Sequence, residues 1–490
     1  MVNTTESESA GKAVGEPSAA YVSMAEDWRP IQDLLGGTRR MREVAIASDT
    51  WLPRFEKESP NAYASRVRGS FLHNFYADNV SKLAAKPFSK SLTVEEDALP
   101  EHLRPMIEDM DLDGTTLQAF AEESFCDAIN FGLSHAIVDY TEIPENVEAR
   151  QNGKAGDRVA ELAIKPRPRA ILVRPDAILG WRTRRGPQNE TIISMIRIAE
   201  TRVEPDGDFG EKVVSYVRVW TEAECQVWKK DADAGEEGEY IPEEAKPHTF
   251  GSIPLRTWYA NRTGFMEAQP PLLDLAWVTI DHWQSYSDQR NILHVARVPI
   301  LFRKGISKSN LAKEGAFVLG ASRVISTSSD TADVRYVEPS GGAISAGKDH
   351  LESLERRADI LGAEPMASRG PATATGEIRA ESKATSWILS WIEAEERWLR
   401  SVFDAAAAWT PKAGELSEDF RVRIPKDFDL RASAGEEYGL IQKDHADGAI
   451  TAGRRLAEGK RRGIYPEDFD PDAEAELALS AKPEIFAGEE

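Results

Sequence analysis

The stretch from Ile253 to Thr410 constrains the fold most, because a single compact core does not explain it. It reads as a long helix, a short apolar β segment, a second helix, a loop and a third long helix. The first helix follows Pro270-Pro271 and is about 27 residues, or roughly 40 Å, long. Its apolar stripe is narrow for a helix of that length. The loop from Glu364 to Gly376 has almost nothing to bury. We therefore expect the chain to form one part of a larger assembly.

The other two helices of this stretch show clear amphipathic patterns. The second helix, Lys348 to Leu361, repeats Leu351, Leu354 and Ala358. The third begins after Thr375-Gly376, and Trp387, Trp391 and Trp398 lie along one side of it. A wide aromatic stripe is typical of a helix that faces a core, so we expect packing rather than cofactor or base stacking there.

The N-terminal region combines a polar leader with two predicted helices. Residues 1–40 are expected to be a disordered or extended arm, and Met41 to Thr50 a short connector. Ser59-Pro60 is a strong helix start, since Ser caps and Pro suits the first turn. That helix is predicted to continue to Lys86-Pro87, and a second one to run from Asp113-Gly114 to Gly132.

Between residues 134 and 241 the hydrophobic period changes from 3.6 to 2, which predicts strands. Asp206-Gly207 separates two of them and reads as a hairpin turn. The region is therefore expected to be a mostly antiparallel α+β domain. The predicted strands are His135–Tyr140, Ala170–Arg174, Thr191–Glu200, Lys212–Thr221 and Gln226–Lys230, with a further short strand at Phe420–Ile424.

Composition excludes several classes of protein. The chain of 490 residues has a net charge of -22, so it is a poor non-specific DNA clamp, since binding to phosphates depends on Lys and Arg. Two cysteines 99 positions apart fit buried or half-buried thiols in a reducing compartment. No apolar run reaches the roughly 18–20 residues of a bilayer span, so no membrane role is expected.

One motif suggests an enzyme. Residues Gly342 to Lys348 have the spacing of a phosphate-binding loop between a predicted strand and a helix. Asp349 stands where Ser or Thr would bind Mg²⁺, and Asp139 is the only nearby candidate for a second magnesium ligand. The histidines show no metal-ligand spacing, so we expect no catalysis, no metal and no cofactor. A P-loop-like nucleotide-dependent enzyme built around Gly342–Lys348 remains the alternative, and a generic scaffold or adaptor protein a third possibility.

The order of these segments resembles the portal protein of tailed bacteriophages, the head-to-tail connector ring through which DNA enters and leaves the capsid. The resemblance lies in order rather than in any sharp signature. The segments that carry it are 52–66, 251–255, 271–275 with Ile280-Asp281, 298–301 and 462–471.

The resemblance implies a domain layout for a portal-like protomer. An α/β wing would precede two stem helices that flank a small clip, followed by a long spine helix and a helical C-terminal crown. The implied boundaries are the arm at 1–40, the wing at 41–269, the stem helix at 270–297, the clip at 298–346, the second stem helix at 347–362, the tunnel loop at 363–377, the spine and wing return at 378–424 and the crown at 425–490.

The resemblance also implies partners and contact residues. The expected partners are identical copies in a ring of twelve, double-stranded DNA in the channel, the terminase large subunit, a head–tail adaptor and the major capsid protein. The ring would assemble in the host bacterial cytoplasm and sit at one capsid vertex of the virion. The implied DNA-facing residues are Arg369, Thr373, Thr375, Arg379 and Lys383; the clip docking residues are Ile300, Phe302, Phe317, Val334 and Tyr336; the residues that pack stems in the ring are Leu272, Leu275, Trp283, Tyr286 and Leu293.

Overall fold

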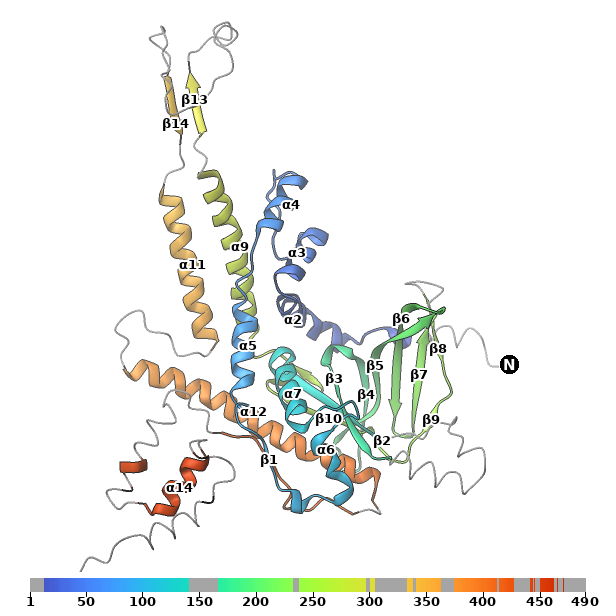
Figure 1. The fold of residues 1–490 in the computed structure, drawn as a ribbon. Coiled ribbons are helices and arrows are strands. Elements are labelled where there is room, and N and C mark those ends of the chain that lie inside the picture. Colours follow the sequence, from blue (N-terminus) through green and yellow to red (C-terminus); the bar gives the residue numbers. More distant parts are fainter. Residues whose placement is uncertain are drawn as a thin grey trace, which may run out of the picture. The chain divides into compact units, whose positions relative to one another are not determined.

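The fold is α+β, as the sequence predicts (Figure 1). The computed structural model describes residues 13–140, 166–231, 238–296, 300–304, 333–337, 341–362, 374–411 and 414–426, and parts of 441–470. The chain divides into two compact units, Met1–Pro425 and Lys426–Glu490. In the second unit the structure describes helix α14 (Ala452–Arg461), in which Leu456 is buried.

The N-terminal region is helical, so the prediction of a disordered or extended arm is wrong for residues 13–40. Helix α2 (Ala19–Leu35) and helix α3 (Gly37–Ser48) replace the arm and the connector. Trp28, Ile31 and Leu34 of α2 are buried, and the indole of Trp28 donates to the Phe131 carbonyl at 3.0 Å. The polar composition of the first twenty residues hid this apolar stripe. Residues 1–12 lie outside the described part.

The helix predicted from Ser59 to Lys86 is two helices, α4 (Pro60–Gly69) and α5 (Phe75–Ala85). The predicted cap is confirmed, because the Ser59 hydroxyl accepts from the Ala62 amide at 3.2 Å. Asn74 caps α5 by accepting from Ala77 at 3.2 Å. The two helices have separate caps, and Phe71, which falls between them, is exposed.

Helix α7 (Leu117–Phe131) is confirmed and ends at Gly132, whose φ of 86° favours glycine. A Cβ at Gly132 would also lie 2.6 Å from the Gln269 carbonyl oxygen. A three-stranded antiparallel sheet follows, in the order β10-β2-β3. Its strands are β10 (Leu255–Tyr259), β2 (Leu133–Tyr140) and β3 (Pro168–Val173).

A larger antiparallel sheet has the order β4-β5-β6-β7-β8, and β9 also pairs with β7. The turn at Asp206-Gly207 is confirmed, because Asp206 pairs with Gly210 across the β5–β6 hairpin. The predicted strands in this region are confirmed, whereas β4, β8 and β9 were not predicted. The strands are β4 (Ile178–Arg185), β5 (Thr191–Asp206), β6 (Gly210–Thr221), β7 (Glu224–Lys230), β8 (Tyr240–Pro242) and β9 (Lys246–Pro247).

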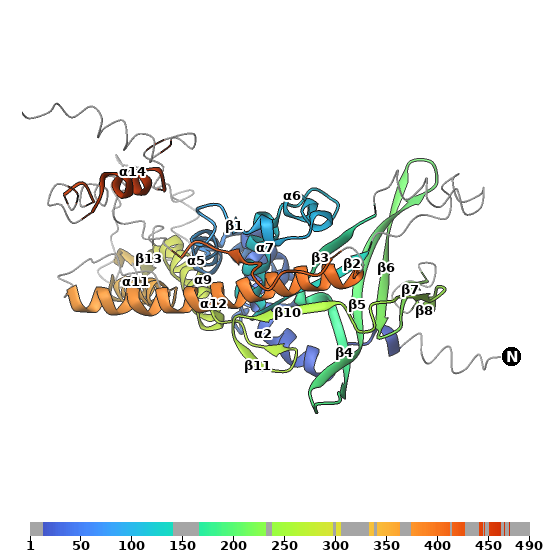
Figure 2. The ribbon, with the colours of Figure 1, turned by 90° about the horizontal axis from the view of Figure 1, so that it is seen from below.

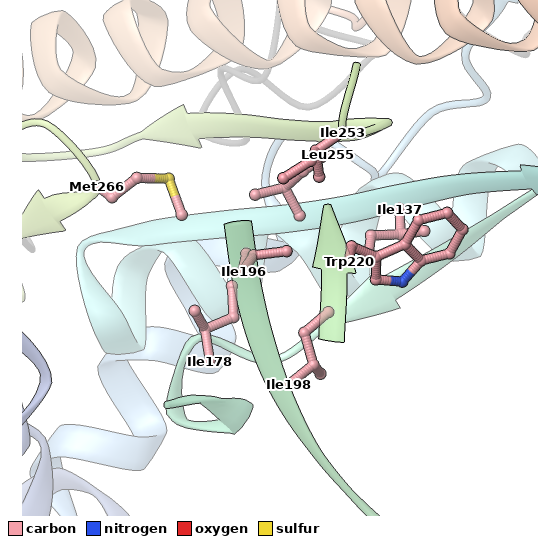
Figure 3. Packing of buried hydrophobic residues seen from close by; sticks show 8 residues of the cluster. All are labelled: Ile137, Ile178, Ile196, Ile198, Trp220, Ile253, Leu255 and Met266. Atoms are coloured by element: carbon pink, nitrogen blue, oxygen red, sulfur yellow. The ribbon is translucent and has the colours of Figure 1, made fainter. Parts of the chain in front are cut away.

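The two sheets share a hydrophobic core (Figure 3). Strands β2 and β10 contribute side chains to it from the smaller sheet, and β4, β5 and β6 from the larger one. Burial of such side chains stabilises the pairing of the sheets by about 1.5–3 kcal/mol for each large residue. The buried members are Ile137, Ile178, Ile196, Ile198, Trp220, Ile253, Leu255 and Met266.

Shorter elements complete the first unit. The predicted strand at Phe420–Ile424 is observed as β15 (Val422–Arg423), which pairs with β1 (Thr93–Val94). The other short elements are 3-10 helices η1 (Glu96–Ala98), η2 (Glu101–Leu103) and η4 (Pro175–Ala177), helix α6 (Pro105–Glu108) and strands β11 (Arg262–Gly264) and β12 (Glu267–Ala268).

Candidate functional site: the α9–α11 hairpin and helix α12

Two long helices form an antiparallel hairpin with a small β unit at its end. Helix α9 (Leu273–Ala296) has 24 residues and helix α11 (Gly341–Leu361) has 21. Between them, strands β13 (Ile300–Lys304) and β14 (Asp333–Val337) pair antiparallel with each other. Figure 1 shows this β unit beyond the ends of both helices. Helix α11 begins at Gly341, seven residues before the predicted start at Lys348 and inside the segment predicted as the clip.

Helix α9 is rooted in the protein by its N-terminal half. Leu272, Leu275 and Trp283 are buried, at 2%, 1% and 0% exposure. Helices α2, α4, α5 and α11 all contact α9, so it is covered on more than one side. These three residues were predicted to pack against identical neighbours, but their surface is already used inside the chain. The apolar repeat predicted burial correctly and assigned it to the wrong partner.

The other two predicted stem residues keep part of their surface. Tyr286 is half-buried and stacks on His282, with ring centroids 6.0 Å apart, and Leu293 is also half-buried. The more exposed apolar side chains of the hairpin, within its described residues, were not singled out by the sequence. They are Trp277 at 46% and Ile292 at 37% on α9, and Ile360 at 59% on α11.

The contact between α9 and α11 depends on a small residue. A Cβ on Gly347 would overlap the side-chain oxygen of Gln289, whose amide donates to the Ile344 carbonyl at 2.9 Å. Glycine at this position lets the two helices approach closely. At the other end of α11, a Cβ on Gly362 would overlap the buried Asn79 of α5.

The helical backbone of α11 contradicts the alternative of a phosphate-binding loop at Gly342–Lys348. The residues from Gly342 to Lys348 are the first turns of α11, whereas a phosphate loop needs irregular backbone that turns its amides toward the ligand. Lys348 is exposed and forms an i,i+4 ion pair with Glu352 at 3.6 Å. Asp139, the second candidate magnesium ligand, pairs with Arg169 at 3.4 Å. The glycine spacing is explained by helix packing.

His282 occupies the middle of the α9–α11 contact. It is 2% exposed, and its Nε2 lies 3.7 Å from a carboxylate oxygen of Glu355. Burial lowers the pKa of His282, nearby His73 lowers it further, and Glu355 opposes both. The ring packs edge-on to Phe75 with centroids 4.9 Å apart. A neutral, buried imidazole is the result.

Helix α12 (Ala374–Trp409) has 36 residues, roughly 54 Å. As predicted, its tryptophan stripe faces the core: Trp391 and Trp398 are 5% and 3% exposed. The indole of Trp391 donates to the Ala260 carbonyl at 3.0 Å, and that of Trp409 to Val138 at 2.8 Å. These bonds anchor α12 to both ends of the three-stranded sheet. Trp387, one turn earlier, is 39% exposed.

A buried acid lies in the same helix. Glu395 is 0% exposed, and its Oε1 accepts a hydrogen bond from the Ser124 hydroxyl at 2.6 Å. Its Oε2 has no hydrogen-bond partner among the described residues. Burial raises the pKa of Glu395 well above its usual range. The carboxyl is therefore held in its neutral form, and the sequence carried no signal for it.

The predicted DNA-facing and docking residues are placed only in part. Thr375, Arg379 and Lys383 lie on the first turns of α12, so α12 starts before the predicted end of the loop. Arg369 and Thr373 lie outside the described residues. Of the clip residues, Ile300 and Phe302 are on β13, Val334 and Tyr336 are on β14, and Phe317 lies outside the described part.

A cavity of about 560 Å³ lies beside strands of the two sheets. Arg169, Arg202 and Arg218 line it, but each pairs with a carboxylate, of Asp139 or Glu200. Cys225 also lines it, and burial raises its pKa to about 11, so it remains a protonated thiol. Both cysteines are free and half-buried. The cavity therefore has no uncompensated positive charge from these arginines.

Two further observations concern the described residues alone. They contain no group of three or more His, Cys, Asp or Glu side chains placed to hold a metal ion. None of the helices in the described ranges has the length and hydropathy that crossing a bilayer requires.

Comparison with known proteins gives one family match and several structural matches. Residues 271–410 match a family described as "Domain of unknown function (DUF4055)". This match covers both helices of the hairpin and α12. No curated protein matches the sequence.

The structural matches come from gene transfer agent (GTA) particles. A chain in "Virion of native gene transfer agent (GTA) particle" has a TM-score of 0.42 and 11% identity, covering 85% of this chain and 98% of that one. A chain in "Neck of empty GTA particle computed with C6 symmetry" has a TM-score of 0.45 and 10% identity, covering 79% and 90%. A chain in "Neck of native GTA particle computed with C12 symmetry" has a TM-score of 0.40 and 11% identity, covering 87% and 99%.

Proposed function

We propose that this chain is a portal-type subunit that assembles into a closed ring at one capsid vertex and forms the conduit for DNA packaging and ejection. The observation that carries the proposal is the α9–β13–β14–α11 hairpin, rooted at one end and tipped by a β unit at the other. In this proposal the hairpin is the stem, the β unit is the clip, and α12 is the spine that leads from the tunnel loop. The role is structural and needs no cofactor.

The exposed surfaces of the hairpin support contact with a second copy. The outer face of α9 presents Asp274 and Asp281 beside the exposed Trp277. The outer face of α11 presents Arg356 and Arg357 beside the exposed Ile360. The α9 patch is acidic, whereas on α11 the two arginines stand among the exposed Glu352, Glu355 and Asp359. Each patch carries an exposed apolar residue. Two different patches on one protomer, one acidic and one with two arginines, suit a heterologous contact, which forms a ring when the rotation between copies closes.

The net charge also suits a conduit. Twelve subunits of -22 would carry about -264. A lumen of that sign would repel phosphates and keep DNA from adhering. In this proposal Arg369, Arg379 and Lys383 supply sparse positive charge that touches the DNA backbone. The β13–β14 unit would be the docking surface for the terminase large subunit and later for a head–tail adaptor, because short strands leave edges that can pair.

The test is assembly of the purified full-length chain, measured by native mass spectrometry and negative-stain imaging. We expect closed rings with cyclic symmetry, most simply of twelve subunits. The variant Trp277→Glu should weaken assembly, because it places a charge in the contact. Ile241→Glu is the matched control, since Ile241 is 59% exposed but lies on β8, away from the hairpin. A wild-type chain that forms only monomers or two-fold dimers at micromolar concentration would refute the proposal.

A further inference from the structure

The β5–β6 hairpin extends beyond the rest of its sheet. Strand β4 pairs with β5 only as far as Ile198, and β7 pairs with β6 only from Tyr216 onward. Past these points β5 and β6 pair with each other alone, up to Asp206 and Gly210. A free two-stranded ribbon buries little and is marginally stable in water. Its tip is therefore a surface that gains from being covered.

The tip of this ribbon is both apolar and acidic. Phe209 is fully exposed, and the cross-strand pair Val203 and Val213 is 62% and 70% exposed. Residues 203–213 also carry four carboxylates against one lysine. Glu204 is occupied, because both its oxygens bind the Lys229 ammonium at 2.7 and 2.8 Å. The other three, Asp206, Asp208 and Glu211, are exposed and form no ion pair within the described residues.

The opposite end of the same sheet is basic. The end of β4 and its turn into β5 carry Arg182, Arg184 and Arg185, all exposed. Arg184 pairs with Glu222 at 2.7 Å. Arg182 forms no ion pair in the described part of the chain, and Arg185 donates only to Asn189 and Thr191 oxygens.

Half-buried apolar side chains lie beside these arginines. Met195 stands directly across from Arg182, and Ile192 directly across from Arg184, on the neighbouring strand β5. The basic end therefore offers apolar contact area as well as positive charge. Apolar contact area would suit the exposed Phe209 ring of the β5–β6 tip, and positive charge would suit its carboxylates.

Strand β5 connects the two ends. It has 16 residues and so spans roughly 50 Å between them. Figure 2 shows the β5–β6 hairpin and the β4–β5 turn pointing in opposite directions from the body of the sheet. Two tips would repel each other, as would two basic ends, so a two-fold contact through either is disfavoured. A tip and a basic end attract.

We propose that the β5–β6 tip (residues 203–213) docks on the β4–β5 end (residues 182–195) of a second copy of this chain, as a wing-to-wing contact. This inference rests on the proposed ring and adds a second contact to it. Phe209 packs against Met195 and Ile192 of the next copy, while Asp206 and Asp208 pair with its Arg182 and Arg185. Charge complementarity at such a contact sets orientation and suppresses wrong pairings.

The test exchanges the charges in the full-length chain. A tip variant carries Asp206→Lys and Asp208→Lys, and an end variant carries Arg182→Glu and Arg185→Glu. Each variant alone should assemble about tenfold more weakly or worse, because attraction becomes repulsion. Mixed in equal amounts, they should form rings in which the two variants alternate, since each tip then meets an oppositely charged end. A control with Asp97→Lys and Glu101→Lys makes the same charge change as the tip variant on the exposed η1 and η2 helices, and should assemble normally.

Each outcome decides the matter. Rings from the single variants that match those of the wild type would overturn the contact and leave the proposed ring standing. Failure of the mixture to assemble, with each variant melting at the wild-type temperature, would overturn it as well. A wild-type chain that forms no ring would overturn the proposed function and the contact together. Phe209→Ser, which changes no charge at a fully exposed site, should also weaken assembly; normal assembly of this variant would exclude the packing role of Phe209.

Discussion

Replacing the buried Glu395 by glutamine should make the protein more stable at neutral pH. Glutamine has nearly the same shape, and its Oε1 can still accept the hydrogen bond from Ser124 that is 2.6 Å long in the native chain. Burial raises the pKa of Glu395 in the folded state, whereas an unfolded glutamate titrates near 4.3. The unfolded chain therefore releases a proton above about pH 4.3 that the folded chain retains.

The sign and size follow from that difference. Because the folded pKa is the higher one, native stability falls as the pH rises from about 4.3 toward the folded pKa. Each pH unit in that window costs about 1.4 kcal/mol. Glutamine has no such dependence. Below about pH 4.3 the wild type and Glu395→Gln should have nearly the same free energy of unfolding, and the variant's advantage should grow with pH above it.

Tryptophan fluorescence is a suitable probe, since Trp391 and Trp398 flank Glu395 on the same buried face of α12. Urea midpoints would be measured between pH 4 and pH 8 for the wild type, Glu395→Gln and Glu393→Gln. Glu393 is exposed, so its variant should follow the wild type within about 0.5 kcal/mol at every pH. Parallel curves for Glu395→Gln and the wild type would refute the argument that a neutral acid is buried in α12.

Two further changes test packing. Gly347→Leu should destabilise the α9–α11 hairpin by about 1–3 kcal/mol, because Gln289 must then turn away from Ile344 or the helices must separate. The control Lys348→Ala should change the free energy of unfolding by less than about 0.5 kcal/mol. Equal effects of the two changes in thermal unfolding would contradict the helix-packing role of Gly347. Trp398→Ala should cost about 3–5 kcal/mol, since its buried indole stacks on Phe120 with centroids 5.8 Å apart. Trp387→Ala, at 39% exposure, should cost about 1 kcal/mol or less by urea unfolding, and a loss as large as that of Trp398→Ala would show that exposure is not what separates them.

Periodicity and turn chemistry were enough to predict most of the elements. Helix α4 begins after Ser59 because a hydroxyl can cap its first turn, and α7 ends at Gly132 because a glycine can adopt positive φ. Both effects are local. The Asp206-Gly207 turn is local in the same way. Strand β4 was missed because Arg182, Arg184 and Arg185 break the apolar alternation on which strand prediction depends.

What covers an apolar face is a tertiary property, and there the sequence misled. The repeat from Leu272 to Trp283 is equally consistent with a neighbouring copy and with helices of the same chain. Those helices include α2, which the composition of residues 1–40 had hidden. The long, narrow stripe and the portal resemblance favoured a ring neighbour, whereas α2 and the other helices of the same chain cover it. The burial of Glu395 was not predicted for a related reason. The hydrophobic pattern of the sequence does not show which one of many carboxylates the tertiary fold buries.

The two halves of α9 face different surroundings, and this difference limits how the hairpin can act. The N-terminal half is held by buried residues such as Leu275 and Trp283, whereas Asn291, Ile292 and His294 near the other end are exposed. Helix α11 is covered mainly along one stripe, through Leu354 and Ala358. The α9–α11 hairpin is packed at its base and more exposed toward its tip. It can transmit a force from the tip only if neighbouring copies support its sides. If the β13–β14 unit docks a motor, as proposed, the exposed sides of α9 and α11 must therefore be buried by assembly, and Ile292 should be more protected from solvent in the ring than in the monomer.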